Sequence, residues 1–170
     1  MNNISFKNDI LPLKNSLYRL ALRITFSAEE SEDIVQETLI KVWNKRGEWG
    51  DIESIEAFCF TICRNLALDS VKRKENNNDS LEDAPIEQPD DNSNPLENAQ
   101  QKDKIEFVKQ ILNSLPEKQR SCMQLRDFEG RPYKQIAKIL GITEEQVKVN
   151  IFRARQAVKE RYQKIDNYGL

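Results

Sequence analysis

A chain of 170 residues, of which 38% are hydrophobic and 32% charged, has room for one or two small globular domains. It contains no histidine, no glycine-rich phosphate-binding loop and no apolar run long enough to span a membrane, which disfavours most enzyme classes and a membrane-embedded protein. The N-terminus lacks the basic-then-apolar pattern of a signal peptide, so we expect a cytoplasmic protein that needs no cofactor.

Residues 1–74 predict a first domain that is wholly helical. An amphipathic repeat over residues 10–24 indicates the first helix, which breaks near Phe26. Ser27 and Glu30 then form a capping box at the start of a second helix. The first turn of that helix is rich in acidic residues, which the helix dipole favours.

The second helix should end near Gly47, ahead of a loop over residues 48–53, and Ser54 should cap a third helix. One face of the third helix is apolar and is predicted to face the core: Ile55, Phe58, Cys59, Ile62 and Leu66. Its other face is polar: Thr61, Arg64, Asn65, Asp69 and Lys72. The helix closes on a basic run over 72–74, which is also a common stabilising choice at a helix C-terminus.

The three cysteines are predicted to be buried thiols. Cys59 and Cys63 share one helical face at a spacing that could hold half of a zinc site, but no further Cys or His pair could complete it. A small enzyme that uses Asp33 and Glu37, or Cys122, is disfavoured because no base, metal site or phosphate cradle converges with them. We therefore expect neither a metal site nor an active site.

The net charge of −2 hides a strong asymmetry along the chain. Residues 75–101 hold eight acidic and no basic residues, together with three prolines, and are predicted to form a flexible acidic linker. Residues 102–165 hold 15 basic and 8 acidic residues. Such a basic domain, at residues 102–170, is typical of a protein that contacts nucleic-acid phosphates.

The basic domain is predicted to begin with two helices. The first carries a set of apolar residues: Ile105, Val108, Ile111, Leu112 and Leu115. Pro116 suits the first position of the second helix, which should stop at Gly130.

Residues 132–158 predict a helix-turn-helix. A short amphipathic helix ends at Gly141, and Thr143 with Gln146 forms a capping box at the start of a longer one. The longer helix has a core stripe of Val147, Ile151, Ala154 and Val158. Its opposite face and flanks hold Glu145, Lys148, Val149, Phe152, Arg153, Arg155 and Gln156. This face could enter a DNA major groove, and an ordinary helical hairpin with a solvated face is the alternative.

These segments together resemble the extracytoplasmic-function sigma factors, the small two-domain class of bacterial RNA polymerase sigma subunits. The resemblance covers nearly the whole chain. It is carried by DIVQE from Asp33, FCFTICRNLALDSVKRK from Phe58, LPEKQR from Leu115 and EGRPYKQIAKILGITEEQVKVNIFRAR from Glu129, in that order. The resemblance implies an all-α protein with sigma domain two at 1–74 and sigma domain four at 102–170.

The resemblance also implies roles for individual residues. The polymerase-binding positions match Asp33, Gln36 and Glu37, which are otherwise ordinary acids and amides of a solvated first turn. The positions that meet the minus-ten element match Arg64, Asn65, Asp69, Lys72 and Arg73. The positions that read the minus-thirty-five element match Lys148, Val149, Phe152 and Arg153. Phosphate contacts are expected from Arg131, Lys134 and Arg155.

Two further segments have open alternatives. The loop over 48–53 matches the one that captures a flipped base in this family, where Trp49 either stacks on that base or folds back on the core. The acidic linker over 75–101 either follows the RNA exit path or is a solvated spacer. Family departures at Phe58 and Cys59 keep that site apolar, whereas Val149 and Asn150 leave the promoter sequence open.

The expected function is therefore promoter recognition. The protein would bind core RNA polymerase, deliver it to promoter DNA, help to open the duplex and then leave. It would be a monomer when free, and an anti-sigma factor would hold it inactive. The alternative is a stand-alone helix-turn-helix regulator, which would bind duplex DNA tightly by itself as a symmetric dimer.

Overall fold

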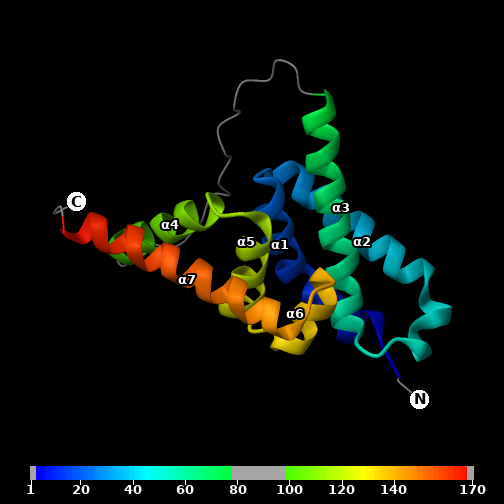
Figure 1. Cartoon of the computed structure of the whole chain (residues 1–170). Helices are drawn as coiled ribbons and strands as arrows, with labels where there is room; N and C mark the ends of the chain where they lie inside the picture. Colours follow the sequence, from blue (N-terminus) through cyan, green and yellow to red (C-terminus); the bar gives the residue numbers. More distant parts are fainter. Residues whose placement is uncertain (1–2, 78–98, 168–170) are drawn as a thin grey trace.

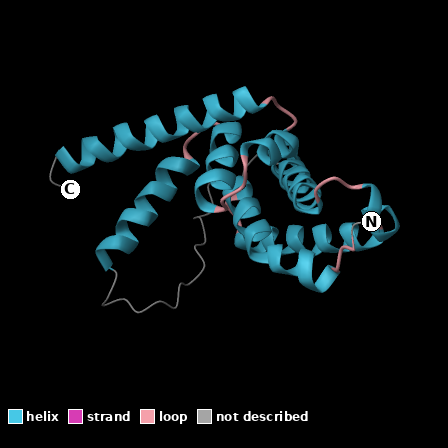
Figure 2. Ribbon diagram, turned by 90° about the horizontal axis from the view of Figure 1, so that it is seen from below, coloured by secondary structure: helices cyan, strands magenta, loops and turns pink. Residues whose placement is uncertain are grey.

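The computed structural model of the chain describes residues 3–77 and 99–167. Helices joined by loops make up this part of the chain, so the predicted all-α fold is confirmed (Figure 2). The predicted linker lies outside the described residues between 78 and 98. None of the helices in the described ranges is both long and apolar enough to cross a membrane.

The N-terminal domain contains three α-helices, preceded and interrupted by short helical turns. Its elements are η1 (Phe6–Ile10), η2 (Leu11–Leu13), α1 (Lys14–Thr25), α2 (Ala28–Asn44), η3 (Arg46–Asp51) and α3 (Ile55–Asn77). The predicted break after the first helix is confirmed, because Phe26 takes a left-handed conformation with φ 59°. The predicted start at Ile10 is wrong: a π-turn and a 3-10 turn, with Pro12 in its first positions, precede α1.

The capping box predicted for α2 forms only in part. Ser27 Oγ accepts a hydrogen bond from the Glu30 amide at 3.2 Å, as expected. The Glu30 carboxylate, however, accepts a hydrogen bond from Ser70 of α3 at 3.2 Å and pairs with Lys74 at 2.9 Å. The acid therefore ties α2 to α3. The helix also ends at Asn44, earlier than predicted, because the chain tightens into η3 where a loop was expected.

Helix α3 is buried on more sides than its sequence pattern predicted. Ser54 caps it as expected, with its Oγ accepting from the Ala57 amide at 3.2 Å. Phe60 is fully buried and Arg64 is 7% exposed, although Arg64 was assigned to the polar face. The reason is tertiary: α3 packs on α1 and α2 from one side and on α6 from another. A single amphipathic stripe does not anticipate a second packing partner.

The C-terminal domain consists of α4 (Ala99–Asn113), α5 (Glu117–Met123), η4 (Gln124–Phe128), α6 (Tyr133–Leu140) and α7 (Glu144–Asn167). Pro116 is the N-cap of α5 and so precedes the position predicted for it. The second predicted helix is split, because α5 passes into the π-turn η4. Gly130 has φ 69° and follows that turn where the stop was expected.

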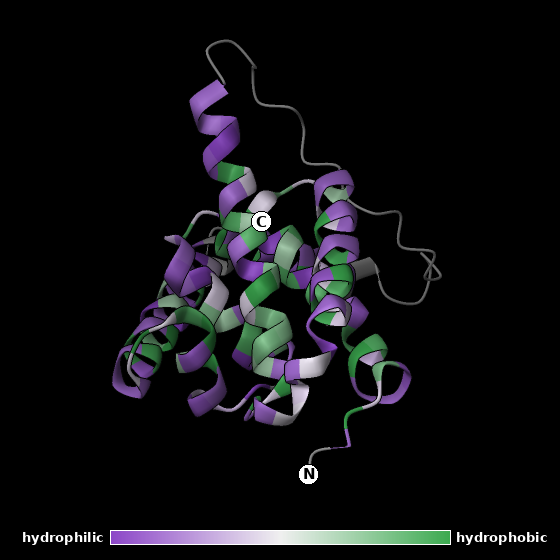
Figure 3. Ribbon diagram, turned by 90° about the vertical axis from the view of Figure 1, so that its right-hand side faces the viewer, coloured by the Kyte–Doolittle hydropathy of each residue, from purple (hydrophilic) through white to green (hydrophobic). Residues whose placement is uncertain are grey.

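The two domains pack against each other (Figure 1). Helix α1 contacts α5 and η4, and helix α3 contacts α6. Helix α4 runs beside α7 (Figure 1) and meets α1 at its C-terminal end, where Asn113 accepts a hydrogen bond from Arg23. One hydrophobic cluster is continuous from Leu17 and Phe60 to Ile136 and Ile151, so the helix-turn-helix shares its core with the N-terminal domain. Apolar residues gather inside the assembly, and the projecting C-terminal end of α3 is hydrophilic (Figure 3).

Candidate nucleic-acid and polymerase interfaces

The helix-turn-helix is formed by α6 and α7 with the caps that the sequence predicted. Gly141 has φ 68° and ends α6. The Thr143 amide donates to Gln146 Oε1 at 3.0 Å and the Gln146 amide donates to Thr143 Oγ1 at 3.1 Å, so this capping box is confirmed in both directions. These local bonds fix the angle at which α7 leaves the turn.

The first turns of α7 present an exposed face of mixed character. Lys148 and Arg153 are exposed, Val149 is 45% exposed and Phe152 is 63% exposed. The predicted core stripe on the other side is buried at Val147, Ile151 and Ala154 and partly buried at Val158. A large aromatic side chain standing in solvent between two cations is suited to contacts with base edges and thymine methyl groups in a major groove.

The three predicted phosphate contacts all engage carboxylates in this structure. Arg155 donates through Nε to Asp127 Oδ2 at 3.0 Å, and this hydrogen bond raises the pKa of its guanidinium. Arg131 pairs with Glu56, and Lys134 lies 3.9 Å from Glu53. Both of these acids belong to the N-terminal domain.

Most of the predicted minus-ten residues form an exposed stripe along α3. Asn65, Asp69, Lys72 and Arg73 are exposed and recur at about one-turn intervals. Arg64 differs from them. Its Nε donates to Glu117 Oε1 at 2.9 Å and its Nη2 donates to Glu117 Oε2 at 2.8 Å, so the side chain is held at the domain boundary.

Trp49 folds back on the core, which was one of the two placements expected for it. The residue is 8% exposed, and its indole Nε1 donates to the Val42 carbonyl at 3.0 Å. Its ring meets the Trp43 ring edge-on, with centroids 6.2 Å apart. In this arrangement the indole links η3 to α2 and presents little surface to a base.

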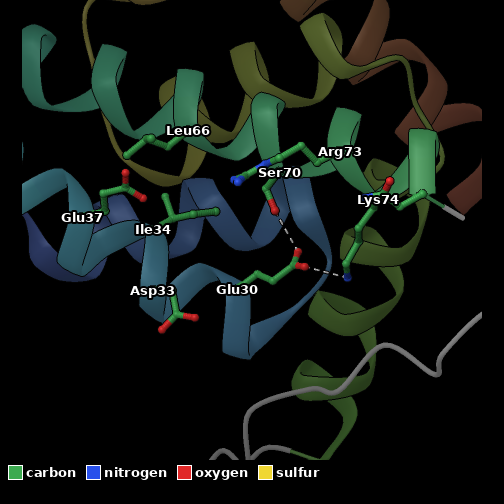
Figure 4. Close-up of a pocket in the computed structure, with 9 residues that line it drawn as sticks. Glu30, Asp33, Ile34, Glu37, Leu66, Ser70, Arg73 and Lys74 are labelled. Atoms are coloured by element: carbon green, nitrogen blue, oxygen red, sulfur yellow. Dashed lines mark hydrogen bonds and ion pairs between the residues drawn. The ribbon is translucent and has the colours of Figure 1, made fainter.

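The predicted polymerase-binding residues Asp33, Gln36 and Glu37 are all exposed on α2. Asp33 and Glu37 border a surface pocket of about 400 Å³ between α2 and α3, whose opposite wall includes Leu66 and Arg73 (Figure 4). Gln36 does not line this pocket. The pocket therefore brings two predicted polymerase contacts next to one predicted minus-ten residue.

Sequence reasoning missed several residues at these surfaces. Ile40 is 58% exposed one turn after Gln36, so an apolar side chain continues the exposed face of α2. Glu53, Glu56 and Lys138 were also missed, because nothing in the local sequence places the acids against α6. The signal for Ile40 was its helical spacing, whereas the acids could be found only from the packing of the domains.

The thiols have no ligand-like arrangement. Cys59, Cys63 and Cys122 are free and buried, and burial raises the pKa of each to about 12. Cys63 donates to the Leu17 carbonyl at 3.3 Å. Within the described ranges no group of His, Cys, Asp and Glu side chains could hold a metal ion.

Comparison with known proteins connects these surfaces to a family. Residues 10–77 match the model of sigma-70 region 2, and residues 108–158 match the model of sigma-70 region 4. The sigma-H factor of Pseudomonas aeruginosa is 30% identical over 165 residues, covering 91% of this chain and 86% of that protein. The ECF RNA polymerase sigma factor SigL of Mycobacterium tuberculosis is 30% identical over 150 residues, covering 88% and 84%.

A solved structure agrees with these matches. The sigma factor RpoE of Bartonella quintana, crystallised in complex with the anti-sigma factor NepR, is similar with a TM-score of 0.76 and 25% identity, covering 93% of this chain and 96% of that chain. A region 2 domain followed by a region 4 helix-turn-helix defines a sigma subunit of RNA polymerase. This chain belongs to the extracytoplasmic-function family of sigma factors.

Membership of this family decides between the two functions that the sequence left open, a sigma factor and a stand-alone regulator. The protein is an alternative sigma factor, a DNA-binding initiation factor that directs RNA polymerase to promoters. A stand-alone helix-turn-helix regulator does not account for the region 2 match over residues 10–77.

Proposed function

We propose that residues 1–74 bind core polymerase and the minus-ten element, that residues 102–170 read the minus-thirty-five element, and that residues 75–101 join the two domains as a linker. The observation that carries this proposal is the exposed face of α7, where Phe152 and Val149 stand between Lys148 and Arg153. Solvent exposure of that aromatic ring gives no stability to the free protein, so a partner surface is its best explanation.

The chemistry of this face fits duplex DNA. Arg153 can donate two hydrogen bonds to a guanine, and Lys148 can reach a guanine edge or a phosphate. Val149 and Phe152 can contact thymine methyl groups. Arg131, Lys134 and Arg155 would hold phosphates and set the register of α7 without reading sequence.

The exposed stripe of α3 would meet the minus-ten element. Asn65 and Asp69 offer hydrogen-bonding groups to the bases of this element, and Lys72 and Arg73 offer positive charge to its phosphates. Arg64 would join them only after leaving Glu117. Trp49 would stack on a flipped base only after breaking its hydrogen bond to the Val42 carbonyl. We therefore assign it a structural role, which is to hold η3 against α2.

Core polymerase would contact α2. Asp33, Gln36 and Glu37 are exposed and could accept hydrogen bonds from basic partner side chains. An anti-sigma factor is a natural inhibitor for such a face, since a similar sigma factor was solved with one bound. In this proposal the protein acts in the cytoplasm and is monomeric when free.

Transcription in vitro with substituted promoters tests the assignment of α7. With core polymerase and each variant, initiation is measured on promoters that carry every base at each minus-thirty-five position. Arg153→Ala should relax the preference at one or two positions, with about 1–3 kcal/mol less discrimination there. Arg155→Ala should weaken all promoters about equally. An unchanged base preference in Arg153→Ala and Lys148→Ala would refute the assignment.

A further inference from the structure

Three cations of the C-terminal domain gather around the ring of Tyr133, the first residue of α6. The Arg126 guanidinium lies over this ring, 4.3 Å from its centroid, and the Lys148 ammonium lies 5.8 Å from the same centroid. The third cation is Arg155, whose pKa is raised by its hydrogen bond to Asp127 and, to a smaller degree, by Tyr133. One aromatic ring therefore connects η4 and α6 to two cations of α7.

Tyr133 offers these cations a fixed surface. Its side chain is partly buried and packs against the hydrophobic core. Arg126 is fixed as well, because its Nη1 donates to the Arg131 carbonyl at 3.1 Å. An exposed lysine has many rotamers, and the attraction of its ammonium group to an aromatic ring favours those that bring it to the ring. The ring of Tyr133 should therefore draw Lys148 toward the α6 side of α7.

Arg153 of the same helix has no such tether. It is exposed, and within the described ranges it lies over no aromatic ring and pairs with no carboxylate. Its guanidinium is thus free to enter a groove and to donate two hydrogen bonds to a guanine. The two cations of the α7 face therefore differ in freedom, although both were assigned to the same DNA element.

The surroundings of Lys148 suit a phosphate better than a base. Its neighbour across the ring, Arg155, is a proposed phosphate contact. Three positive charges lie around one ring, and the Asp127 carboxylate, which pairs with Arg155, offsets one of them. A backbone phosphate would offset the remainder, because its oxygens accept hydrogen bonds from ammonium and guanidinium groups alike.

We propose that Tyr133 is a positioning residue for the reading helix: its ring holds Lys148 beside Arg155, so that Lys148 binds a backbone phosphate and the guanine preference of α7 comes from Arg153. Tyr133 thereby separates a cation that sets the register of α7 from one that reads sequence. This inference rests on the proposed contact of α7 with the minus-thirty-five element.

The first test uses the full-length protein with core polymerase and a promoter from which this holoenzyme initiates, randomised at the minus-thirty-five element. Fragments bound by the holoenzyme are recovered and sequenced, and the salt dependence of binding is measured on one of them. Lys148→Ala should weaken binding, leave the base frequencies as in the wild type and lower the salt slope by about one. Arg153→Ala should flatten the base frequencies at one or two positions.

The second test couples Tyr133 to Lys148 by a double-mutant cycle on the same promoter. Tyr133→Leu should weaken binding by roughly two- to fivefold, as expected for loss of one cation–ring contact. This effect should shrink in the Lys148→Ala background and persist in the Arg153→Ala background, which is the matched control. Tyr133→Phe keeps the ring and should retain most of the affinity. Circular dichroism checks that each variant keeps its helices.

The outcomes separate the inference from the function beneath it. Altered base frequencies in Lys148→Ala would overturn the inference and leave the contact of α7 with DNA in place. The same would follow if Tyr133→Leu had equal effects in both backgrounds, or if Tyr133→Phe lost as much affinity as Tyr133→Leu. Unchanged base frequencies in both Arg153→Ala and Lys148→Ala would overturn the proposed function itself.

Discussion

Arg64 of α3 and Glu117 of α5 form a two-point ion pair across the domain boundary, with N–O distances of 2.9 and 2.8 Å. The Arg64 side chain is 8% exposed and that of Glu117 is 23% exposed. Paired hydrogen bonds in this planar geometry are strong and directional. The pair therefore fixes how the two domains meet and keeps a proposed DNA contact out of solvent.

Loss of this pair should destabilise the folded protein. Glu117→Gln leaves the Arg64 guanidinium with a neutral partner in a mostly buried site, which should lower the free energy of unfolding by about 2–3 kcal/mol. Urea denaturation measures the change, and Glu160→Gln on the exposed side of α7 is the control. A shift no larger than that of the control would mean that the pair contributes nothing to stability.

The thiol of Cys122 should report on the domain boundary. At pH 8 a pKa of about 12 leaves roughly one thiolate in 10,000, so alkylation by iodoacetamide should be slow at all three cysteines. Cys122 belongs to the cluster shared by both domains. Combining Glu53→Gln, Glu56→Gln and Glu117→Gln should accelerate its alkylation, measured by mass spectrometry, and leave Cys63 protected. Equal acceleration at both sites would instead indicate global unfolding.

The same thiols predict how stability depends on pH. Their folded pKa of about 12 lies above the ordinary value of 9.0, so unfolded thiols lose protons first as the pH rises. Above about pH 9 the free energy of unfolding should therefore fall, with each thiol contributing up to about 1.4 kcal/mol per pH unit. Cys122→Ala should make this slope shallower by about that amount in urea titrations at pH 9–11. An unchanged slope would contradict the assigned pKa.

Trp49 should matter for stability more than for DNA contact. Trp49→Phe removes the donor to the Val42 carbonyl and should lower the free energy of unfolding by about 1–3 kcal/mol. Trp43→Phe, at a half-exposed ring, is the control. Promoter opening by polymerase with Trp49→Phe should match the wild type wherever the variant stays folded. Defective opening by a fully folded variant would return Trp49 to the set of base contacts.

The sequence predicted best those features that depend on neighbouring residues. The turn at Gly141 and the Thr143 capping box use contacts within four positions of the chain, and both formed as expected. The exposed face of α7 also followed from helical period alone. Local prediction failed for the Glu30 carboxylate, because it pairs with Lys74 of α3 and does not complete the capping box of its own helix.

Features that depend on packing between distant segments were not predictable in this way. Arg64 is next to the exposed Asn65 on the predicted polar face, yet it is buried and pairs with Glu117 of α5. The sequence is compatible with an outward or an inward Trp49 ring. The hydrogen bond to the Val42 carbonyl and the contact with the Trp43 ring hold it in the inward position. The ion pairs of Glu53 with Lys138 and of Glu56 with Arg131 depend on the packing of both domains, since neither acid lies near its partner in sequence.

The most direct test of the central claim is transcription in vitro with core polymerase from a related bacterium, a pool of promoter fragments and mapped start sites. Specific starts should appear only when the protein is present and share two upstream elements. They should be lost with Asn65→Ala and become less selective for the minus-thirty-five sequence with Arg153→Ala. If the protein directs no start and does not bind core polymerase, yet shifts duplex DNA by itself, its assignment as a promoter-specificity subunit is contradicted.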